Sequence, residues 1–119
     1  VAKECTVHPN YKAKILKAKD IDTIATGKRL GHPVRCLKNQ FSRELFKQEY
    51  NPQVTDEQLE QMGAGALRKA AKEGDEKNGS FMAGQCAAMV HQEQTAQEMI
   101  EEMFAQAEQL LKKSPSYCS

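Results

Sequence analysis

The sequence contains no tryptophan, and only 6% of its 119 residues are aromatic. A core built from it must therefore rest on leucine, isoleucine, methionine, valine and alanine. Apolar residues make up 39% and charged residues 28%, which is ordinary for one small soluble domain. No apolar run approaches the roughly 18 residues that a membrane-spanning helix needs, so no membrane association is predicted.

An excess of one charge sign is also missing, because the formal net charge is +1. Nucleic-acid-binding domains normally carry a clear basic excess, so nucleic acid is not an expected partner. The basic residues do gather early, at Lys12, Lys14, Lys17, Lys19, Lys28, Arg29, Arg35 and Lys38. We interpret the early lysines as the solvated face of a helix, and a docking surface for an acidic partner is the alternative.

The four cysteines, Cys5, Cys36, Cys86 and Cys118, form no CxxC pair, and their wide spacing matches no zinc pattern. A disulfide framework is not expected in a chain with this much predicted helix, which favours a reducing compartment. No secretory signal is recognisable. Cys86 lies in an apolar run and is predicted to be a buried thiol that packs as a small hydrophobic side chain.

The apolar periodicity predicts a mainly α-helical chain with one short β element. Residues 8–19 are predicted as a helix, because Pro9 is tolerated in a first turn and an apolar stripe follows it. Residues 21–26 and 34–39 alternate between apolar and polar side chains around a glycine-containing turn, which predicts a hairpin. A lone two-stranded hairpin is marginal in water, so the helices must cover something.

Short helices are predicted over residues 40–50 and 66–72. Another begins at Thr55, because Thr55 and Gln58 match a capping box. The glycines of "MGAGA", Gly63 and Gly65, are too weak a signal for a dinucleotide fingerprint, since no strand precedes them. We interpret them as a helix–helix corner that needs left-handed backbone.

The last predicted helix is the clearest element. Thr95 and Glu98 form a second capping box at its start. Lys112 and Lys113 suit its carboxyl end, and Pro115 is expected to stop it. Its apolar residues form one helical stripe. They are Met99, Ile100, Met103, Phe104, Ala107, Leu110 and Leu111.

Residues that could carry chemistry are few. His8, His32 and His91 are isolated and are interpreted as surface or loop histidines. The sequence has no Gx[ST]xG elbow and no Walker loop. No set of His, Asp or Cys has metal-ligand spacing. The residues alone therefore predict neither a catalytic group nor a metal site.

The segment "NGSFMAGQCAAMV", Asn78 to Val90, has two interpretations. In the structural one it is a loop-to-helix junction with Ser80 as N-cap. In the functional one, free N–H groups at the helix start face a ligand, and the small Ala83 and Gly84 let a planar ring approach the backbone. Met82 would add a soft apolar contact, and Gln85 both a donor and an acceptor.

Several segments taken together resemble a known family. They are "VAKECTVHPNYKAKILKAKDIDT", "GHPVRCLKN", "EQMGAGALRKA", and "NGSFMAGQCAAMV" followed by "EQTAQEMIEEMF". In this order they are similar to the C-terminal part of flavin-dependent enoyl-ACP reductase II, within the nitronate monooxygenase / 2-nitropropane dioxygenase superfamily. The resemblance implies a bacterial, cytoplasmic enzyme of fatty-acid synthesis that reduces trans-2-enoyl-ACP. Hydride would pass from NADH or NADPH through bound FMN to the enoyl β-carbon.

The resemblance also implies a fold, a TIM barrel with a smaller, mainly helical domain. The chain begins with "VAKEC" and no methionine, so residues 1–119 are expected to be a single C-terminal fragment. Its expected parts are a helix after the last barrel strand (1–20), a β element (21–40), a helical cap region (41–78), and a pocket loop with C-terminal helices (79–119). The catalytic histidine and the FMN-phosphate loops of the family would lie upstream of this chain. We therefore assign the catalytic role to none of His8, His32 and His91.

By resemblance, "GSFMAGQ" is the segment that reaches over the barrel mouth beside the flavin and substrate pocket. The expected cofactor-binding residues are Ser80, Phe81, Met82, Ala83, Gly84 and Gln85. The expected partners are the missing N-terminal barrel portion, an acyl carrier protein-linked substrate and, as one option, a second copy in a homodimer. The fragment alone is expected to be inactive.

Two alternatives stay open. One is a nitronate monooxygenase with the same flavin fold, which would oxidise nitronates with oxygen, although "HPNYK" and "EQMGAGAL" favour the reductase. The other is a non-enzymatic helical interaction module whose partner groove is formed by Met99, Met103 and Phe104.

Overall fold

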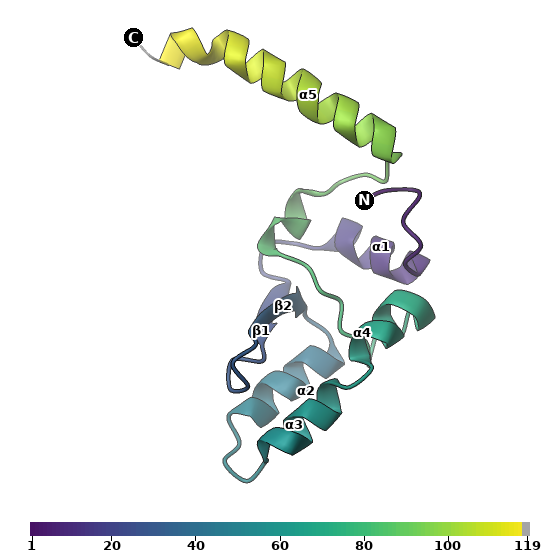
Figure 1. The fold of residues 1–119 in the computed structure, drawn as a ribbon, viewed down its shortest axis with the longest axis vertical. Helices are drawn as coiled ribbons and strands as arrows, with labels where there is room; N and C mark the ends of the chain where they lie inside the picture. Colours follow the sequence, from purple (N-terminus) through teal and green to yellow (C-terminus); the bar gives the residue numbers. More distant parts are fainter. Residues whose placement is uncertain (118–119) are drawn as a thin grey trace. The chain divides into compact units, whose positions relative to one another are not determined.

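The computed structural model of the protein describes residues 1–117, so Cys118 lies outside the described part. The chain divides into two compact units (Figure 1). The larger is Val7–His91, and the smaller combines Val1–Thr6 with the chain from Gln92 onward. The predicted composition, mainly α with one short β element, is confirmed.

The larger unit contains one hairpin and a succession of short helices. In chain order its elements are α1 (Pro9–Lys17), β1 (Thr23–Thr26), β2 (Val34–Leu37), α2 (Gln40–Glu49), α3 (Asp56–Gly63), α4 (Ala66–Arg68), a π-helical turn (Lys69–Glu73) and a 3₁₀ helix (Gln85–Met89). Its core cluster is small, and consists of Tyr11, Leu37, Ala70 and Phe81 with half-buried apolar neighbours.

Helix α1 begins with Pro9 at its first position, as predicted, since a missing N–H costs nothing there. The residue before it, predicted as a surface or loop histidine, lies in the loop and has an added role. His8 is half-buried, and its ring Nδ1 accepts the Asn10 N–H at 3.1 Å, so it caps α1 instead of lying free on the surface. Lys17 and Lys19 are exposed, but Lys14 is half-buried, so the early lysines do not form one uniformly solvated face.

The hairpin is also confirmed. β1 and β2 pair antiparallel, with Thr23 opposite Leu37 and Thr26 opposite Val34. The turn between them contains Gly27 at φ 81°, in the left-handed region that favours glycine. The Gly27 N–H donates to the carboxylate of Glu49 on α2, which fastens the turn to that helix.

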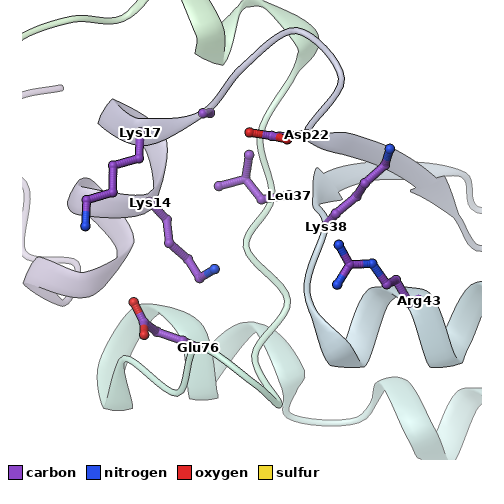
Figure 2. Close-up of a pocket in the computed structure, with 8 residues that line it drawn as sticks. Lys14, Lys17, Asp22, Leu37, Lys38, Arg43 and Glu76 are labelled. Atoms are coloured by element: carbon purple, nitrogen blue, oxygen red, sulfur yellow. The ribbon is translucent and has the colours of Figure 1, made fainter.

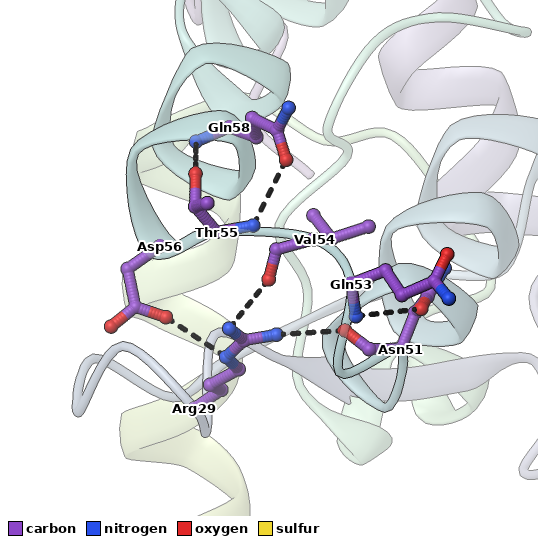
Figure 3. A network of polar contacts seen from close by, with 7 residues as sticks. All are labelled: Arg29, Asn51, Gln53, Val54, Thr55, Asp56 and Gln58. Carbon is purple, nitrogen blue, oxygen red and sulfur yellow. Dashed lines mark hydrogen bonds and ion pairs between the residues drawn. The ribbon is translucent and has the colours of Figure 1, made fainter.

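Arg29, in the same turn, ties the hairpin to the connection between α2 and α3 (Figure 3). Its guanidinium donates to the carbonyl of Val54 at 2.6 Å and to that of Asn51 at 3.2 Å, and it pairs with Asp56 at 2.8 Å. The capping box at Thr55 is present as predicted, because Thr55 Oγ1 accepts the backbone N–H of Gln58. The start of α3 is thereby fixed from two sides.

The glycine corner after α3 behaves as predicted at one of its two glycines. Gly65 has φ 74° and immediately precedes α4, which is the left-handed corner that the sequence indicates. Gly63 does not have a positive φ and is the last residue of α3. Downstream, the π-helical turn ends at Gly74, which has φ 64°.

The segment after Gly79 corrects two predictions. Ser80 is not a helix N-cap, because residues 80–83 are extended and lie along β2. The helix begins only at Gln85 and is a five-residue 3₁₀ helix with no side-chain cap. Cys86 is exposed, not buried. A short apolar run fits an extended segment and a helix equally well, and hydrogen bonds to β2 favour the extended backbone here.

The smaller unit is dominated by α5 (Ala96–Lys113), the long yellow-green helix in Figure 1. Its predicted capping box is present, since Thr95 Oγ1 accepts the Glu98 N–H. The α-helix ends at Lys113, two residues before Pro115, and continues as a short 3₁₀ turn. None of its residues is buried in the described structure, and Phe104 is 74% exposed. No described helix is both long and apolar enough to cross a membrane.

Candidate functional site

The backbone of residues 80–83 is held from both sides. The Phe81 carbonyl accepts the Leu37 N–H at 2.8 Å, and the Ala83 N–H donates to the Arg35 carbonyl at 3.2 Å, so Met82 forms an isolated antiparallel bridge with Cys36 of β2. The Tyr11 hydroxyl donates to the Met82 carbonyl at 2.7 Å. Backbone bonds to β2 and a side-chain bond from α1 therefore fix where this segment runs.

Because the segment is extended, its side chains alternate between two faces. Phe81 and Ala83 point to the core, where Phe81 is fully buried and its ring centroid lies 5.0 Å from that of Tyr11. Ser80 and Met82 face the other way and line a cavity. Four of the six residues predicted from the resemblance are thus placed. Phe81 and Ala83 pack into the core, and Ser80 and Met82 line the cavity.

This cavity has a volume of about 320 Å³ and lies wholly within the larger unit. Ligand pockets of proteins begin at about this size and are mostly apolar. Its wall is built by the hairpin, α2, α3 and the glycine corner. The lining residues are Thr26, Gly27, Leu30, Val34, Phe41, Leu45, Glu49, Leu59, Glu60, Gly63, Ala64, Ala66, Leu67, Ser80 and Met82.

Only a few polar groups reach this cavity. Glu49 is almost fully buried, and its carboxylate accepts the Gly27 N–H. A buried carboxylate with such a partner fixes structure, here the hairpin turn, because an unpaired one would be costly. Thr26 and Ser80 add hydroxyl groups at the same wall. The cavity therefore suits a mainly apolar ligand group with few hydrogen bonds.

The remaining two predicted residues, Gly84 and Gln85, are exposed where the extended segment passes into the 3₁₀ helix. A Cβ added to Gly84 would meet only Cys86 Sγ, at 3.6 Å, which is ordinary contact. At Gly79, by contrast, a Cβ would lie 2.8 Å from backbone atoms of Ala70. Gly79 is small because the corner is packed, whereas nothing inside the described chain explains a glycine at position 84.

Asn39 is a buried polar residue that sequence reasoning missed. Its side-chain nitrogen donates to the carbonyls of Gly79 at 2.7 Å and Glu76 at 3.0 Å, and its oxygen accepts the Ser42 N–H. It thereby caps α2 and anchors the entrance of the 80–83 segment at once. The available signal was the capping box of Asn39 with Ser42. It is hard to recognise in the sequence, because the third helical residue of a capping box is normally Glu or Gln and here it is serine.

The electrostatics of this region do not activate the Cys36 thiol as a nucleophile. Burial raises the pKa of the Cys36 thiol above its ordinary value, so the thiol stays protonated. His32 and His91 are exposed. Among the residues that the structure describes, no group of three or more His, Cys, Asp or Glu side chains could hold a metal ion.

The loop before Gly79 predicts a pH dependence. Hydrogen bonds from the side chain and N–H of Asn78 hold the pKa of the Asp75 carboxyl below its usual range. The stability that this carboxylate contributes is therefore complete above its unfolded-state pKa and is lost as pH falls through the lower folded-state pKa. We expect a ¹³C NMR titration of the Asp75 carboxyl to show this lowered pKa.

The matched control is Asn78→Ala, which removes one of the two largest causes of the shift. In that variant the pKa of Asp75 should move back toward its ordinary value. Equal titration curves in both proteins would contradict this account of the loop.

Comparisons with known proteins agree with this geometry. The family model described as nitronate monooxygenase matches residues 1–106. The structure of FabK from Thermotoga maritima matches 98% of the chain with a TM-score of 0.89 and 39% sequence identity. A mutant of the same FabK, with one methionine replaced by alanine, matches 98% of the chain with a TM-score of 0.79 and 34% identity. The fold of the chain is therefore similar to part of FabK.

A probable nitronate monooxygenase from Staphylococcus saprophyticus is 30% identical over 104 residues, 87% of the chain. Together with the family model, this similarity shows the family of the chain. The chain belongs to the nitronate monooxygenase family. It spans 28% of the length of the Staphylococcus relative and 36% of the length of FabK.

The predicted fold class is confirmed in this sense. The chain is mainly α-helical with a short β element, and it corresponds to part of FabK, whose fold the resemblance identifies as a TIM barrel.

Proposed function

We propose that the chain forms one wall of the flavin and substrate pocket in an FMN-dependent oxidoreductase that reduces trans-2-enoyl-ACP with NADH or NADPH. The observation that carries this proposal is the likeness to FabK, which extends over 98% of the chain and so includes the 80–85 segment. Membership in the nitronate monooxygenase family supports the broader class. We place the enzyme in the bacterial cytoplasm.

Each residue of the segment has a proposed part in this wall. Exposed Gly84 leaves its backbone open to the face of a planar ring, and exposed Gln85 offers both a donor and an acceptor. Met82, 41% exposed, supplies an apolar contact. Phe81 and Ala83 hold the segment from the core side. FMN, when bound, supplies the hydride chemistry, and this chain orients it and excludes water.

Ser80 and Met82 connect this wall to the apolar cavity. We propose that the cavity accepts part of the acyl group of the substrate, because its lining is largely apolar. An alkyl group gains about 0.8 kcal/mol for each CH₂ that leaves water. The few hydroxyl groups at its wall are too sparse to prefer a charged ligand.

The catalytic steps are assigned to a barrel portion that acts together with this chain. Within the described residues, no buried His and no metal-ligand cluster offers a proton-transfer or Lewis-acid group.

The stripe of α5 supports a further partner surface, because side chains such as Ile100, 55% exposed, and Leu111, 72% exposed, need an apolar cover. We propose the barrel portion as that cover, and a second copy in a homodimer as the other arrangement.

A nitronate monooxygenase is the second candidate function, and the family model and the Staphylococcus relative favour it. The higher identity with FabK, 39% against 30%, favours the reductase. Consumption of an enoyl thioester with NADH indicates the reductase, whereas oxygen uptake with a nitronate indicates the monooxygenase. A non-enzymatic helical module would instead be folded and monomeric alone and would lack flavin.

The proposal predicts a flavin spectrum. We expect the enzyme that combines this chain with a barrel portion to absorb in the visible range, and this absorbance to bleach when NADH is added without oxygen. We expect the 119 residues alone not to turn over enoyl thioester. Robust NADH-dependent reduction by the chain alone would refute the assignment of the catalytic steps to the barrel portion. A colourless full-length enzyme would refute the flavin site.

The variant Gly84→Val tests the wall itself. A Cβ at this exposed position would meet only Cys86 Sγ, at 3.6 Å, so we expect the variant to fold. A β-branched side chain would nevertheless crowd a ring that lies on the backbone. FMN affinity and turnover should therefore both fall about tenfold or more, which corresponds to the loss of one modest contact. Unchanged affinity and turnover in a folded variant would exclude Gly84 from the site.

A further inference from the structure

A second cavity of the larger unit lies between α1, the end of β2 and α2, and no residue of the 80–85 wall lines it. Its volume is about 300 Å³, and its lining is rich in charge (Figure 2). Four of its side chains are cations and two are carboxylates. The lining residues are Lys14, Lys17, Ala18, Asp22, Leu37, Lys38, Arg43 and Glu76.

The cations come from three separate parts of the chain. Lys14 and Lys17 lie three residues apart on α1, Lys38 directly follows β2, and Arg43 lies on α2. Figure 2 shows Lys14 reaching from α1, and Arg43 from α2, toward the space between the helices, whereas the ammonium group of Lys17 points away from it. The fold thus brings together charges that are up to 29 positions apart in the sequence.

None of these four cations forms an ion pair with another residue that the structure describes. Asp22 and Glu76 in the same lining offset only part of their charge. The carboxylate of Asp22 accepts the backbone N–H of Lys19 at 2.8 Å, so part of its hydrogen-bonding capacity is already used. The cavity therefore keeps a net positive charge.

One cation and the backbone beside the cavity are held by specific contacts. The Lys14 ammonium lies 5.2 Å from the centroid of the buried Phe81 ring, a distance at which a cation is attracted to the ring face. The Lys38 N–H donates to the Asp22 carbonyl at 2.7 Å, which fixes the backbone beside the cavity. Leu37 is buried and forms an apolar floor. The floor and the backbone of the site are therefore formed in advance, whereas the side chains of Lys38 and Arg43 are exposed.

The position of Lys38 and Arg43 is unfavourable for α2 itself. Cations near the amino end of a helix oppose its dipole, and α2 has no acidic residue in its first turn to compensate. The capping box satisfies the N–H groups of Asn39 and Ser42, and the Phe41 N–H donates to the Lys77 carbonyl, so an anion would be held mainly by side chains. Helix stability does not account for these two charges, whereas an anionic ligand would.

We propose that this cavity is a binding site for a phosphate group. The planar guanidinium of Arg43 can donate two parallel hydrogen bonds to phosphate oxygens, and the Lys14 ammonium can add a point charge. The exposed Lys38 ammonium points away from them in Figure 2 and would add charge only by turning toward the ligand. The doubly charged phosphate matches the excess of two cations over carboxylates among the lining residues. The proposal does not rest on the flavin function, because no residue of the 80–85 wall lines this cavity.

Titration of the ¹⁵N-labelled 119-residue chain with inorganic phosphate at constant ionic strength tests the site by NMR. We expect saturable shifts of the backbone amides of Leu37, Lys38 and Arg43. The double variant Lys14→Gln/Arg43→Gln should weaken binding about tenfold or more, since it removes two charge-assisted contacts. The control variant Lys47→Gln, which removes an exposed charge of α2 outside the cavity, should bind as the unaltered chain does.

Further titrations separate the sources of the phosphate. Stronger shifts of the same amides with FMN or NADPH than with inorganic phosphate would indicate a cofactor phosphate, and equal shifts would indicate free phosphate or a small phosphate ester. An acidic peptide of Asp and Glu that shifts these amides when phosphate does not would overturn the proposal in favour of a carboxylate-binding surface. Shifts spread over the whole chain, or equal affinity in all variants, would also overturn it.

Discussion

Replacement of Phe81 by alanine is expected to lower the free energy of unfolding of the chain by about 3 to 5 kcal/mol, the usual loss for a large buried aromatic side chain. Phe81 is fully buried, and its ring packs against Tyr11 and lies beneath the Lys14 ammonium. The core cluster contains only four buried residues, so few neighbours are available to collapse into the space. Urea unfolding followed by circular dichroism measures the change.

Met82 is the matched control, because it lies on the same extended segment and points to the opposite face. With 41% of its surface exposed, Met82→Ala should cost less than about 1 kcal/mol. If Phe81→Ala does not fold at all, Phe81→Leu should fold with a smaller loss, because most of the buried volume stays filled. Equal losses for Phe81→Ala and Met82→Ala would contradict the assignment of the two faces.

The alternation of faces also separates stability from function along this segment. Phe81 and Ala83 hold the backbone, so substitutions there should disturb the pocket only by moving it. Met82 and Gly84 contribute little to the fold, so substitutions there should act on ligands directly. Comparing unfolding with ligand affinity for the same variants therefore distinguishes a positioning residue from a contact residue.

Local signals in the sequence predicted much of the fold. The capping boxes at Thr55 and Thr95 are present, since each depends only on residues three apart. The hairpin was predictable for the same reason, because its strands are joined by a short turn with glycines. Pro9 at the first position of α1 was equally local. Where a structure is decided by near neighbours in sequence, the pattern is sufficient.

The extended segment 80–83 could not be predicted in this way. Its partner is β2, more than forty positions earlier, and no local pattern records that pairing. Without it, Ser80 looks like a helix cap and Cys86 like a core residue, and both predictions are wrong. The preference of a short apolar run for strand or helix depends on which partner is nearby.

The candidate site was predicted in outline but not in detail. The resemblance indicated six consecutive residues, and the structure brings Ser80 and Met82 to the apolar cavity while it leaves Gly84 and Gln85 exposed. The charged cavity was not predicted, although the early lysines were recognised as a group. Arg43 completes it from a helix that lies outside that group, and only folding brings the two together.

The second large effect is expected at Gly79, where alanine should lower the free energy of unfolding by about 3 kcal/mol or more. Its added Cβ would lie 2.7 Å from the carbonyl oxygen of Asp75 and 2.8 Å from the backbone nitrogen of Ala70. These are backbone atoms, which cannot rotate away as the end of a side chain can. The corner must therefore open, and this would strain the hydrogen bond from Asn39 to the Gly79 carbonyl as well.

Gly84→Ala is the control for this prediction, because it makes the same chemical change five residues later. Its backbone has φ −77°, which alanine adopts readily, and its nearest neighbour would be at ordinary contact distance. Its stability should change by less than about 0.5 kcal/mol. Thermal unfolding of both variants decides the matter. A stable Gly79→Ala variant would mean that the corner is not packed as described, and a destabilised Gly84→Ala variant would mean that this glycine serves the fold, leaving no reason to reserve it for a ligand.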